Sequence, residues 1–264
     1  MIKNCLITNI FTKKKLRYFI FFSYNGKKFH GWQKQKNANS VQEVMEDSLS
    51  IITKKKINLV GAGRTDTGVH AKTMVAHFDH EDQIDDKDKL IVLLNKFHGN
   101  DIYILDLKKV KIDAHARFNA LSRTYQYHIS FVKNPFNHEF EYYISTKLDL
   151  KAMKKATEIL IKFKDFESFS KKGSDVNNFF CEIYYANWTK VENGLLFTIE
   201  SNRFLRNMVR SIVGTILDVG QKKINIDEFI QIIKSKKRSN AGFSVPPNAL
   251  FLNNIKYHKS IFIK

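Results

Sequence analysis

The spacing of apolar residues divides the first half of the chain into strands and helices. A run rich in aromatic residues, 16–24, ends at the turn signal Asn25-Gly26 and predicts a buried strand. We expect a helix from Ser40, because Ser40-Val41-Gln42-Glu43 has the form of a capping box and apolar residues then recur at helical spacing. The same patterns predict strands at 57–60, 73–78 and 102–110 and a helix at about 86–97.

The second half repeats this order of elements. Its expected strands are 124–131, 180–190, 195–201 and 250–257, with a short apolar segment at 140–144. Its expected helices are 150–163, 204–219 and 226–234. The order β-α-β-β-α-β in each half is that of the ferredoxin-like unit, so we expect two such α+β halves, residues 1–112 and 113–264. Residues 113–122 form the expected hinge, and a ligand is expected in the cleft between the halves.

Composition indicates a soluble globular protein with a polyanionic partner. The chain has 264 residues, of which 43% are hydrophobic and 27% charged. Its 44 Lys and Arg residues against 26 Asp and Glu give a formal net charge of +18. This excess favours nucleic acid over a membrane surface, because the basic residues are spread along the whole chain.

Cysteine content and the N-terminus bear on location. Only Cys5 and Cys181 are present, so we expect neither a disulfide framework nor a thiolate metal site, and a reducing cytoplasm is the expected location. The apolar run 18–22 is too short for the core of a signal peptide, and no segment predicts a membrane span.

The segment 61–71 carries the strongest candidate chemistry. Three of the chain's 11 glycines fall within eight residues here, around Arg64 and Asp66. A hairpin turn with incidental charges is one interpretation. The segment is longer than the two to five residues that a simple hairpin needs, however. We therefore interpret it as a rigid loop that presents a carboxylate beside a fixed cation.

Most of the arginines lie in the stretches of the sequence that are rich in motifs. Only 8 of the 44 basic residues are arginine, and six of these lie in motif-rich stretches. Three of the six, Arg203, Arg206 and Arg210, follow each other at helical spacing and predict a basic face on the expected helix 204–219. Since guanidinium groups bind phosphates and carboxylates in a planar geometry, we expect these arginines to contact RNA or a carboxylate, although chance clustering explains them too.

Four stretches of the sequence resemble the TruA family of tRNA pseudouridine synthases. GRTDTGVHA is similar to the nucleophile loop of that family, and YNGKKFHGWQKQ followed by SVQE is similar to its first strand, turn and helix. HARFNALSRTYQYHI and NRFLRNMVRSIVGTILDVG resemble its second and third motifs. The matches keep their order from about residue 16 to about residue 257. Three places depart from the usual pattern: Thr67, Arg206-Asn207 and Ala249.

The resemblance implies a fold and an activity. The fold is two ferredoxin-like halves that form an extended antiparallel sheet with a central basic cleft. The activity is isomerisation of uridine to pseudouridine at positions 38, 39 and 40 of the tRNA anticodon arm. The resemblance also implies a homodimer that uses no cofactor and no metal.

The resemblance further implies roles for individual residues. Asp66 is the expected nucleophile, Arg64 the cation beside it and the group that fills the gap left by a flipped base. Tyr125 is expected to stack on the target uracil or to mediate proton transfer, and Arg210 to pair with Asp66. Read without the family, Tyr125 is also explained as a core tyrosine and Arg210 as a long side chain at the edge of an apolar helix face. Expected RNA contacts are His115, Arg117, Phe118, Arg123, Arg206 and Tyr125.

Other functions fit parts of the same sequence. A non-catalytic RNA-binding protein or RNA chaperone explains the charge and the fold but not the Arg64-x-Asp66 pair. A uridine-directed glycosidase explains the carboxylate, but it releases free uracil where an isomerase does not. The histidines around residues 77–80 show no convergent third ligand, so a metal site is not expected.

Overall fold

The computed structural model describes residues 15–173 and 177–263, so Cys5 lies outside the described residues. The N-terminal half contains β1 (Leu16–Tyr24), α1 (Val41–Thr53), β2 (Val60–Gly61), β3 (His70–His80), α2 (Lys87–His98) and β4 (Ile102–Val110). The C-terminal half contains β5 (Ala120–Ser130), β6 (Tyr142–Tyr143), α3 (Leu150–Leu160), β7 (Ile183–Val191), β8 (Gly194–Ser201), α4 (Met208–Gly220), α5 (Ile226–Ser235) and β9 (Leu250–Tyr257). Each predicted helix and strand has a counterpart in this order.

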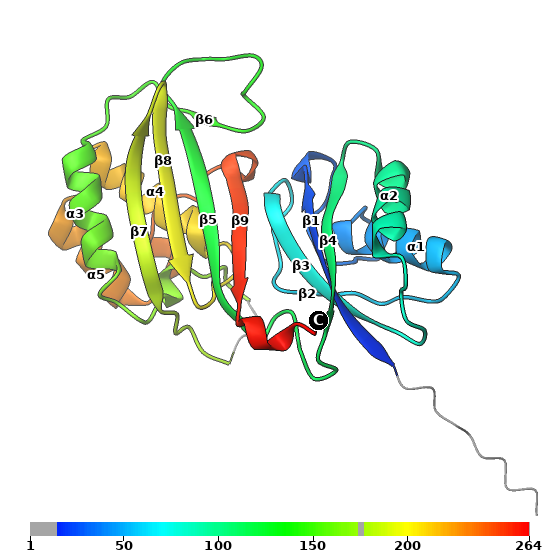
Figure 1. Cartoon of the computed structure of the whole chain (residues 1–264). Helices are drawn as coiled ribbons and strands as arrows, with labels where there is room; N and C mark the ends of the chain where they lie inside the picture. The colour runs from blue at the N-terminus through cyan, green and yellow to red at the C-terminus, as the bar shows by residue number, and fades with distance from the viewer. Residues whose placement is uncertain (1–14, 174–176, 264) are drawn as a thin grey trace, which may run out of the picture.

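The strands form one large, mostly antiparallel sheet. Its order is β4-β1-β3-β9-β5-β8-β7, with β2 paired to β3 and β6 paired to β5 (Figure 1). The predicted extended antiparallel sheet is present, with two parallel pairings in it, because β6 runs parallel to β5 and β9 runs parallel to β3. The β3–β9 pairing joins the two halves through only two residue pairs, His70 with Phe251 and Ala71 with Leu252.

Helices pack beside each half of the sheet. In Figure 1, α1 and α2 lie next to the N-terminal strands, and α3, α4 and α5 next to the C-terminal strands. Helix α1 begins where the sequence predicted, because the side chain of Ser40 accepts a hydrogen bond from the backbone N–H of Glu43 at 3.3 Å. Fully buried side chains such as Phe22 and Met45 on one side and Trp188 on the other continue one hydrophobic core through both halves.

Helix α4 begins later than the sequence predicted. The expected helix 204–219 starts instead at Met208, because Asn207 takes the left-handed conformation with φ of 65° and interrupts the helical backbone. Arg203 and Arg206 therefore lie before the helix, and the predicted basic face that they share with Arg210 is wrong. Strand β2 is also shorter than expected, since residues 57–59 pair with no strand and only Val60–Gly61 joins β3.

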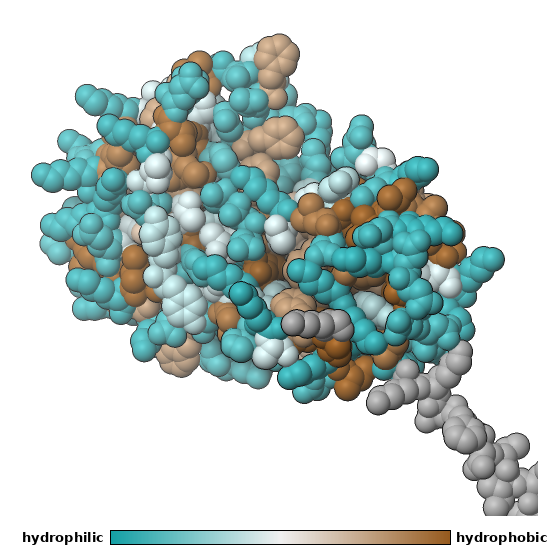
Figure 2. All heavy atoms as spheres, viewed as in Figure 1, coloured by the Kyte–Doolittle hydropathy of each residue, from teal (hydrophilic) through white to brown (hydrophobic). Residues whose placement is uncertain are grey.

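Hydrophilic side chains cover most of the face seen in Figure 2, with hydrophobic ones between them in small groups. Across residues 15–173 and 177–263, the helices are all too short or too polar to span a bilayer.

Candidate active site

The loop between β2 and β3 is fixed to the N-terminal half around Asp66. The carbonyl oxygen of Thr65 accepts a hydrogen bond from the N–H of Trp32 at 3.2 Å. The Thr65 hydroxyl lies 2.8 Å from the hydroxyl of Tyr24, in the interior. The carbonyl of Asp66 accepts a bond from the N–H of Val69 at 3.1 Å, which closes a turn after it. These bonds hold the residue before Asp66 and the turn after it, so the carboxylate leaves a backbone of defined geometry.

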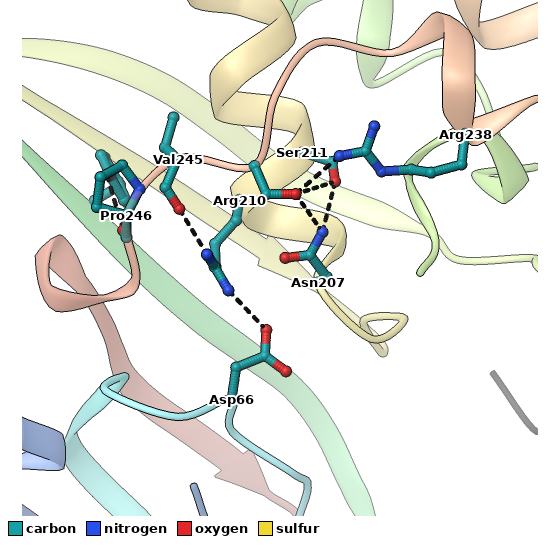
Figure 3. Close-up of polar contacts among 9 residues, drawn as sticks. Asp66, Asn207, Arg210, Ser211, Arg238, Val245 and Pro246 are labelled. Atoms are coloured by element: carbon teal, nitrogen blue, oxygen red, sulfur yellow. Dashed lines mark hydrogen bonds and ion pairs between the residues drawn. The ribbon is translucent and has the colours of Figure 1, made fainter. Parts of the chain in front are cut away.

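Asp66 forms an ion pair with Arg210 of the other half (Figure 3). Its Oδ2 lies 3.3 Å from Nη1 of Arg210. Arg210 also donates from Nε to the carbonyl oxygen of Val245 at 2.7 Å, so its guanidinium is held from two directions. The side chains of Arg210 and Asp66 are 18% and 26% exposed, so the pair lies near the surface but is not freely solvated. The sequence-based expectation that these two residues lie together agrees with this geometry.

A polar network stands beside Arg210 and was not foreseen from the sequence. The side-chain amide of Asn207 donates to the hydroxyls of Ser211 at 2.9 Å and Ser244 at 2.6 Å. Arg238 donates to the same Ser244 hydroxyl at 2.8 Å (Figure 3). It also donates to the carbonyls of residues 241 and 242. Arg238 ends a basic run, 234–238, of the kind that usually forms a solvated face. It instead fixes the segment that carries Val245, and therefore the carbonyl that Arg210 uses.

Tyr125 lies on β5, close to this ion pair. Its side chain is 9% exposed, and its ring meets that of Phe204 edge-on at 5.2 Å. Burial raises the pKa of the Tyr125 hydroxyl well above its usual range, and the nearby carboxylate of Asp66 raises it further. The hydroxyl has no hydrogen-bond partner among the described residues. Tyr125 therefore remains a neutral phenol with an unused donor beside Asp66.

Arg64 does not act as the cation of this pair. Its side chain is exposed and forms no ion pair or hydrogen bond with the residues that the structure describes. The cation in contact with Asp66 is Arg210 instead. The spacing Arg-x-Asp had suggested a neighbouring pair, but residues 64–66 are in neither a helix nor a strand, so spacing alone does not fix the relative direction of the two side chains. Arg64 is thus left free for a partner outside the protein.

Arg123 is turned inward and binds backbone carbonyl groups. Its Nη1 donates to Ala120 at 3.1 Å and to Asn202 at 2.7 Å. Its Nη2 donates to Ala62 at 3.0 Å and also to the carbonyl of Arg117. Burial lowers the pKa of the Arg123 guanidinium from its ordinary value. Four of its five N–H groups are used, so this residue, expected to contact RNA, instead ties the Asp66 loop to two other segments.

The remaining expected RNA contacts lie at or near the surface. The ring of His115 lies 4.3 Å from that of Phe118, and the guanidinium carbon of Arg117 lies 5.6 Å from the centre of the Phe118 ring. Phe118 is 74% exposed, which is unusual for a side chain of its size. Arg206 is exposed as well, on the turn before α4. Arg117, Phe118 and Arg206 are therefore accessible to a partner.

The described residues contain no group of three or more His, Cys, Asp or Glu side chains arranged to hold a metal ion. Asp79, part of the histidine-rich run, is instead paired to Arg17, whose Nε and Nη2 lie 2.6 and 2.9 Å from its two carboxylate oxygens.

A family model described as tRNA pseudouridine synthase matches residues 20–119 and 161–258, well over half of the chain. The chain belongs to the tRNA pseudouridine synthase family. Asp66 and Arg210 fall in the two matched ranges, one in each, whereas Arg123 and Tyr125 fall between them. The family resemblance deduced from the motifs is therefore confirmed.

Individual members of the tRNA pseudouridine synthase family match over nearly their whole length. The protein named tRNA pseudouridine synthase A from Bacteroides fragilis is 48% identical over 247 residues, covering 93% of this chain and 98% of that protein. The protein of the same name from Porphyromonas gingivalis is 44% identical over 250 residues, covering 94% and 99%. That from Thermoanaerobacter sp. strain X514 is 41% identical over 240 residues, covering 90% and 98%.

Proposed function

We propose that the protein isomerises uridine to pseudouridine in tRNA, at positions 38, 39 and 40 of the anticodon arm. The observation that carries this proposal is the Asp66–Arg210 ion pair, in which the two halves of a chain of this family each contribute one residue. The net charge of +18 supports a polyanionic substrate. The reaction needs no cofactor, because it is an isomerisation: uracil loses the proton on carbon 5 to solvent and gains one on N1, so no outside group is transferred and nothing is oxidised or reduced.

In the proposed reaction Asp66 drives the departure of the base. The C–N glycosidic bond of uridine breaks, the uracil turns, and its carbon 5 forms a new bond to the sugar. A carboxylate assists this either by covalent attack or by abstracting a proton. Arg210 stabilises the negative charge of that carboxylate through a charge-assisted hydrogen bond. Tyr125 stacks on the target uracil or passes a proton, since its hydroxyl is neutral and unused.

The target nucleotide must leave its stem before Asp66 can reach it. Extrusion of a base costs roughly a few kcal/mol in lost stacking and pairing. We assign Arg64 to the vacated place, because its exposed planar group is free to stack between bases. Arg117, Phe118 and Arg206 are assigned to RNA contact on account of their exposure, with His115 positioning Phe118.

The proposal extends to the architecture. Strand pairings in the two halves have the same order, β4-β1-β3-β2 and β9-β5-β8-β7, which supports two ferredoxin-like units divided at residues 112 and 113. The central basic cleft is assigned to the junction of the units, where Asp66 and Arg210 meet. The working form is a homodimer in the cytoplasm, where a buried free thiol such as that of Cys181 stays reduced.

One experiment separates this function from its rivals. The protein is incubated with tRNA that carries tritium at carbon 5 of uracil. Isomerisation releases tritium to water, a glycosidase releases labelled uracil, and a non-catalytic RNA-binding protein releases neither. We expect tritium in water, with the mass of the RNA otherwise unchanged. Labelled free uracil or an absence of any release contradicts the proposal.

A further inference from the structure

A hollow of about 530 Å³ lies where the loop between β5 and β6 meets the segment 246–248. Its walls carry aromatic rings, side-chain amides and a single lysine and carboxylate: Tyr142, Tyr143, Asn134, Asn248, Lys133 and Glu141. No step of the proposed reaction uses it.

The hollow lies a short way along β5 from the candidate active site. Tyr125 and Tyr127 are two residues apart on β5, so they face the same side of the sheet at a separation of about 7 Å. The hydroxyl of Tyr127 donates to the carbonyl of Pro246 in the wall of the hollow at 3.0 Å. Its ring also meets that of Tyr142, in the same wall, at 6.5 Å. Tyr127 thus links the neighbourhood of Tyr125 directly to the hollow.

The segment 245–248 also connects the candidate active site to the hollow. Val245 accepts the hydrogen bond from Arg210, and Pro246, the next residue, lines the hollow. Pro247 lies against the Asp66 loop, since a Cβ placed on Gly68 would come within 3.2 Å of its ring. The segment 245–248 therefore contacts Arg210, the Asp66 loop and the wall of the hollow.

The loop that covers the hollow is tied to both halves of the protein. Glu139, near its end, forms an ion pair with Lys27 of the N-terminal half. The carbonyl of His138 accepts a hydrogen bond from the side chain of Asn248 at 3.0 Å. These contacts fix the loop across the junction, so the hollow is a formed site and not a gap under a free loop.

Several polar groups of the hollow have no partner among the residues that the structure describes. Glu141 is half-buried, yet its carboxylate forms no hydrogen bond or ion pair within residues 15–173 and 177–263. The hydroxyls of Tyr142 and Tyr143 are also unpaired in that part of the chain. These groups are partly exposed and have no partner among the described residues, so they are available to a ligand that enters the hollow. A carboxylate accepts from the N–H groups on the edge of a base or from a ribose hydroxyl.

We propose that this hollow binds the base of an unpaired nucleotide of the same RNA, next to the uridine at Asp66. Tyr143, 38% exposed, provides the stacking surface, and Glu141 accepts hydrogen bonds from the base. Lys133, whose Nζ lies 5.5 Å from the centre of the Tyr143 ring, meets the phosphate of that nucleotide. One lysine against one carboxylate suits an uncharged base better than a bare phosphate. The proposal rests on the proposed function, because it takes its ligand from the substrate RNA.

The test is an abasic scan of an anticodon-arm hairpin. Each unpaired nucleotide is replaced in turn by an abasic one, and equilibrium affinity is measured for wild type and Tyr143→Ala. We expect one position at which the missing base weakens wild-type binding roughly tenfold, as typical for one stacked base. The same replacement should change the affinity of Tyr143→Ala less than twofold, since the two changes remove one contact.

Two further variants serve as a second test and as a control. Glu141→Gln keeps the size of the side chain, and we expect it to weaken the intact hairpin several-fold but to leave the abasic hairpin unaffected. Tyr184→Ala removes a ring that is 52% exposed on β7, the edge strand beyond β8, and does not line the hollow, so this variant should keep the wild-type scan. Identical scans for wild type and Tyr143→Ala, or a scan with no sensitive position, overturn the proposal. Tritium release by wild type, measured separately, tests the proposed function, so the two failures are distinguishable.

Discussion

Among the described residues, the carboxylate of Asp66 has one cationic partner, and that partner comes from 144 positions later in the chain. Arg210 reaches it from α4 while a second N–H holds the carbonyl of Val245. The pair is therefore a product of the tertiary structure. In the proposed reaction the two residues have different roles, since Asp66 is the reacting carboxylate and Arg210 orients and stabilises it.

Replacing Asp66 with asparagine should abolish pseudouridine formation, because an amide neither attacks the sugar nor accepts a proton as a carboxylate does. The affinity for tRNA should stay within about tenfold of wild type, since binding comes from many lysine and arginine contacts to phosphates. Tritium release and equilibrium binding measure the two effects on the same preparation. Isomerisation by Asp66→Asn at a measurable rate contradicts the assignment of the nucleophile.

Arg64→Lys keeps the charge at an exposed position but removes the planar group. Since Arg210 already pairs with Asp66, the charge of Arg64 is not needed for the carboxylate. If Arg64 fills the place of the flipped base, lysine should slow the chemical step by roughly tenfold, which is about 1.4 kcal/mol, with little change in affinity. Single-turnover rates at saturating protein measure this. A wild-type rate shows that stacking by Arg64 plays no part.

The sequence indicated the position of Asp66 more directly than it indicated the contacts of Arg123. Asp66 stands in a short, glycine-rich motif, so local sequence was enough to select it. The role of Arg123 depends on carbonyl groups at positions 62, 117, 120 and 202, and backbone carbonyls carry no signal in a sequence. The motif that contains Arg123 suggested RNA contact, but an arginine at this position serves equally well to bind RNA or to bind backbone carbonyl groups.

Arg123→Ala should lower the free energy of unfolding by about 2–3 kcal/mol, because three segments lose a shared, partly buried donor. Urea unfolding measures this loss. Arg117→Ala is the matched control, since Arg117 is exposed; it should leave stability within about 0.5 kcal/mol and weaken tRNA binding instead. If Arg123→Ala keeps its stability and loses more tRNA affinity than Arg117→Ala does, Arg123 contacts RNA and does not serve to hold these segments together.

At the scale of elements, the Asp66 loop needs a close approach from the turn after β1. Gly31 has φ of +90°, and a Cβ there would lie 2.5 Å from the carbonyl oxygen of Thr65. Gly31→Ala should therefore lower the free energy of unfolding by about 2 kcal/mol or more, measured in urea. Gly63→Ala, within the loop itself, meets nothing within 4 Å and should change stability by less than about 1 kcal/mol. Equal stabilities of the two variants would contradict the role given to Gly31.

The hydrophobic pattern predicted elements better than it predicted their ends. Helix α4 has apolar residues at helical spacing from Leu205 onward, so the pattern passes through the true start at Met208 without a break. The left-handed conformation of Asn207 is stabilised by its bonds to Ser211 and Ser244, and Ser244 is 37 positions away. A helix start set by a distant residue cannot be read from local spacing.

At the scale of the whole molecule, the excess of positive charge should govern affinity for RNA. Each phosphate that the protein neutralises releases counterions, so affinity depends on salt. We expect tRNA binding to weaken at least about tenfold between 50 and 200 mM monovalent salt. A titration series at fixed pH measures the slope. A flat affinity across this range would show that the net charge of +18 serves another purpose.

Strand β9, near the middle of the sheet, is the last of the described strands to be synthesised. Strand β9 pairs with β5 on one side and with β3 on the other, yet it follows both in the sequence by more than a hundred residues. A nascent chain that has not yet emerged from the ribosome as far as residue 257 holds β3 and β5 with unpaired edges toward each other. The carbonyl of Val245, which steadies Arg210, also emerges late. The pairing of Asp66 with Arg210 therefore reaches its final geometry only once the chain as far as β9 is free of the ribosome.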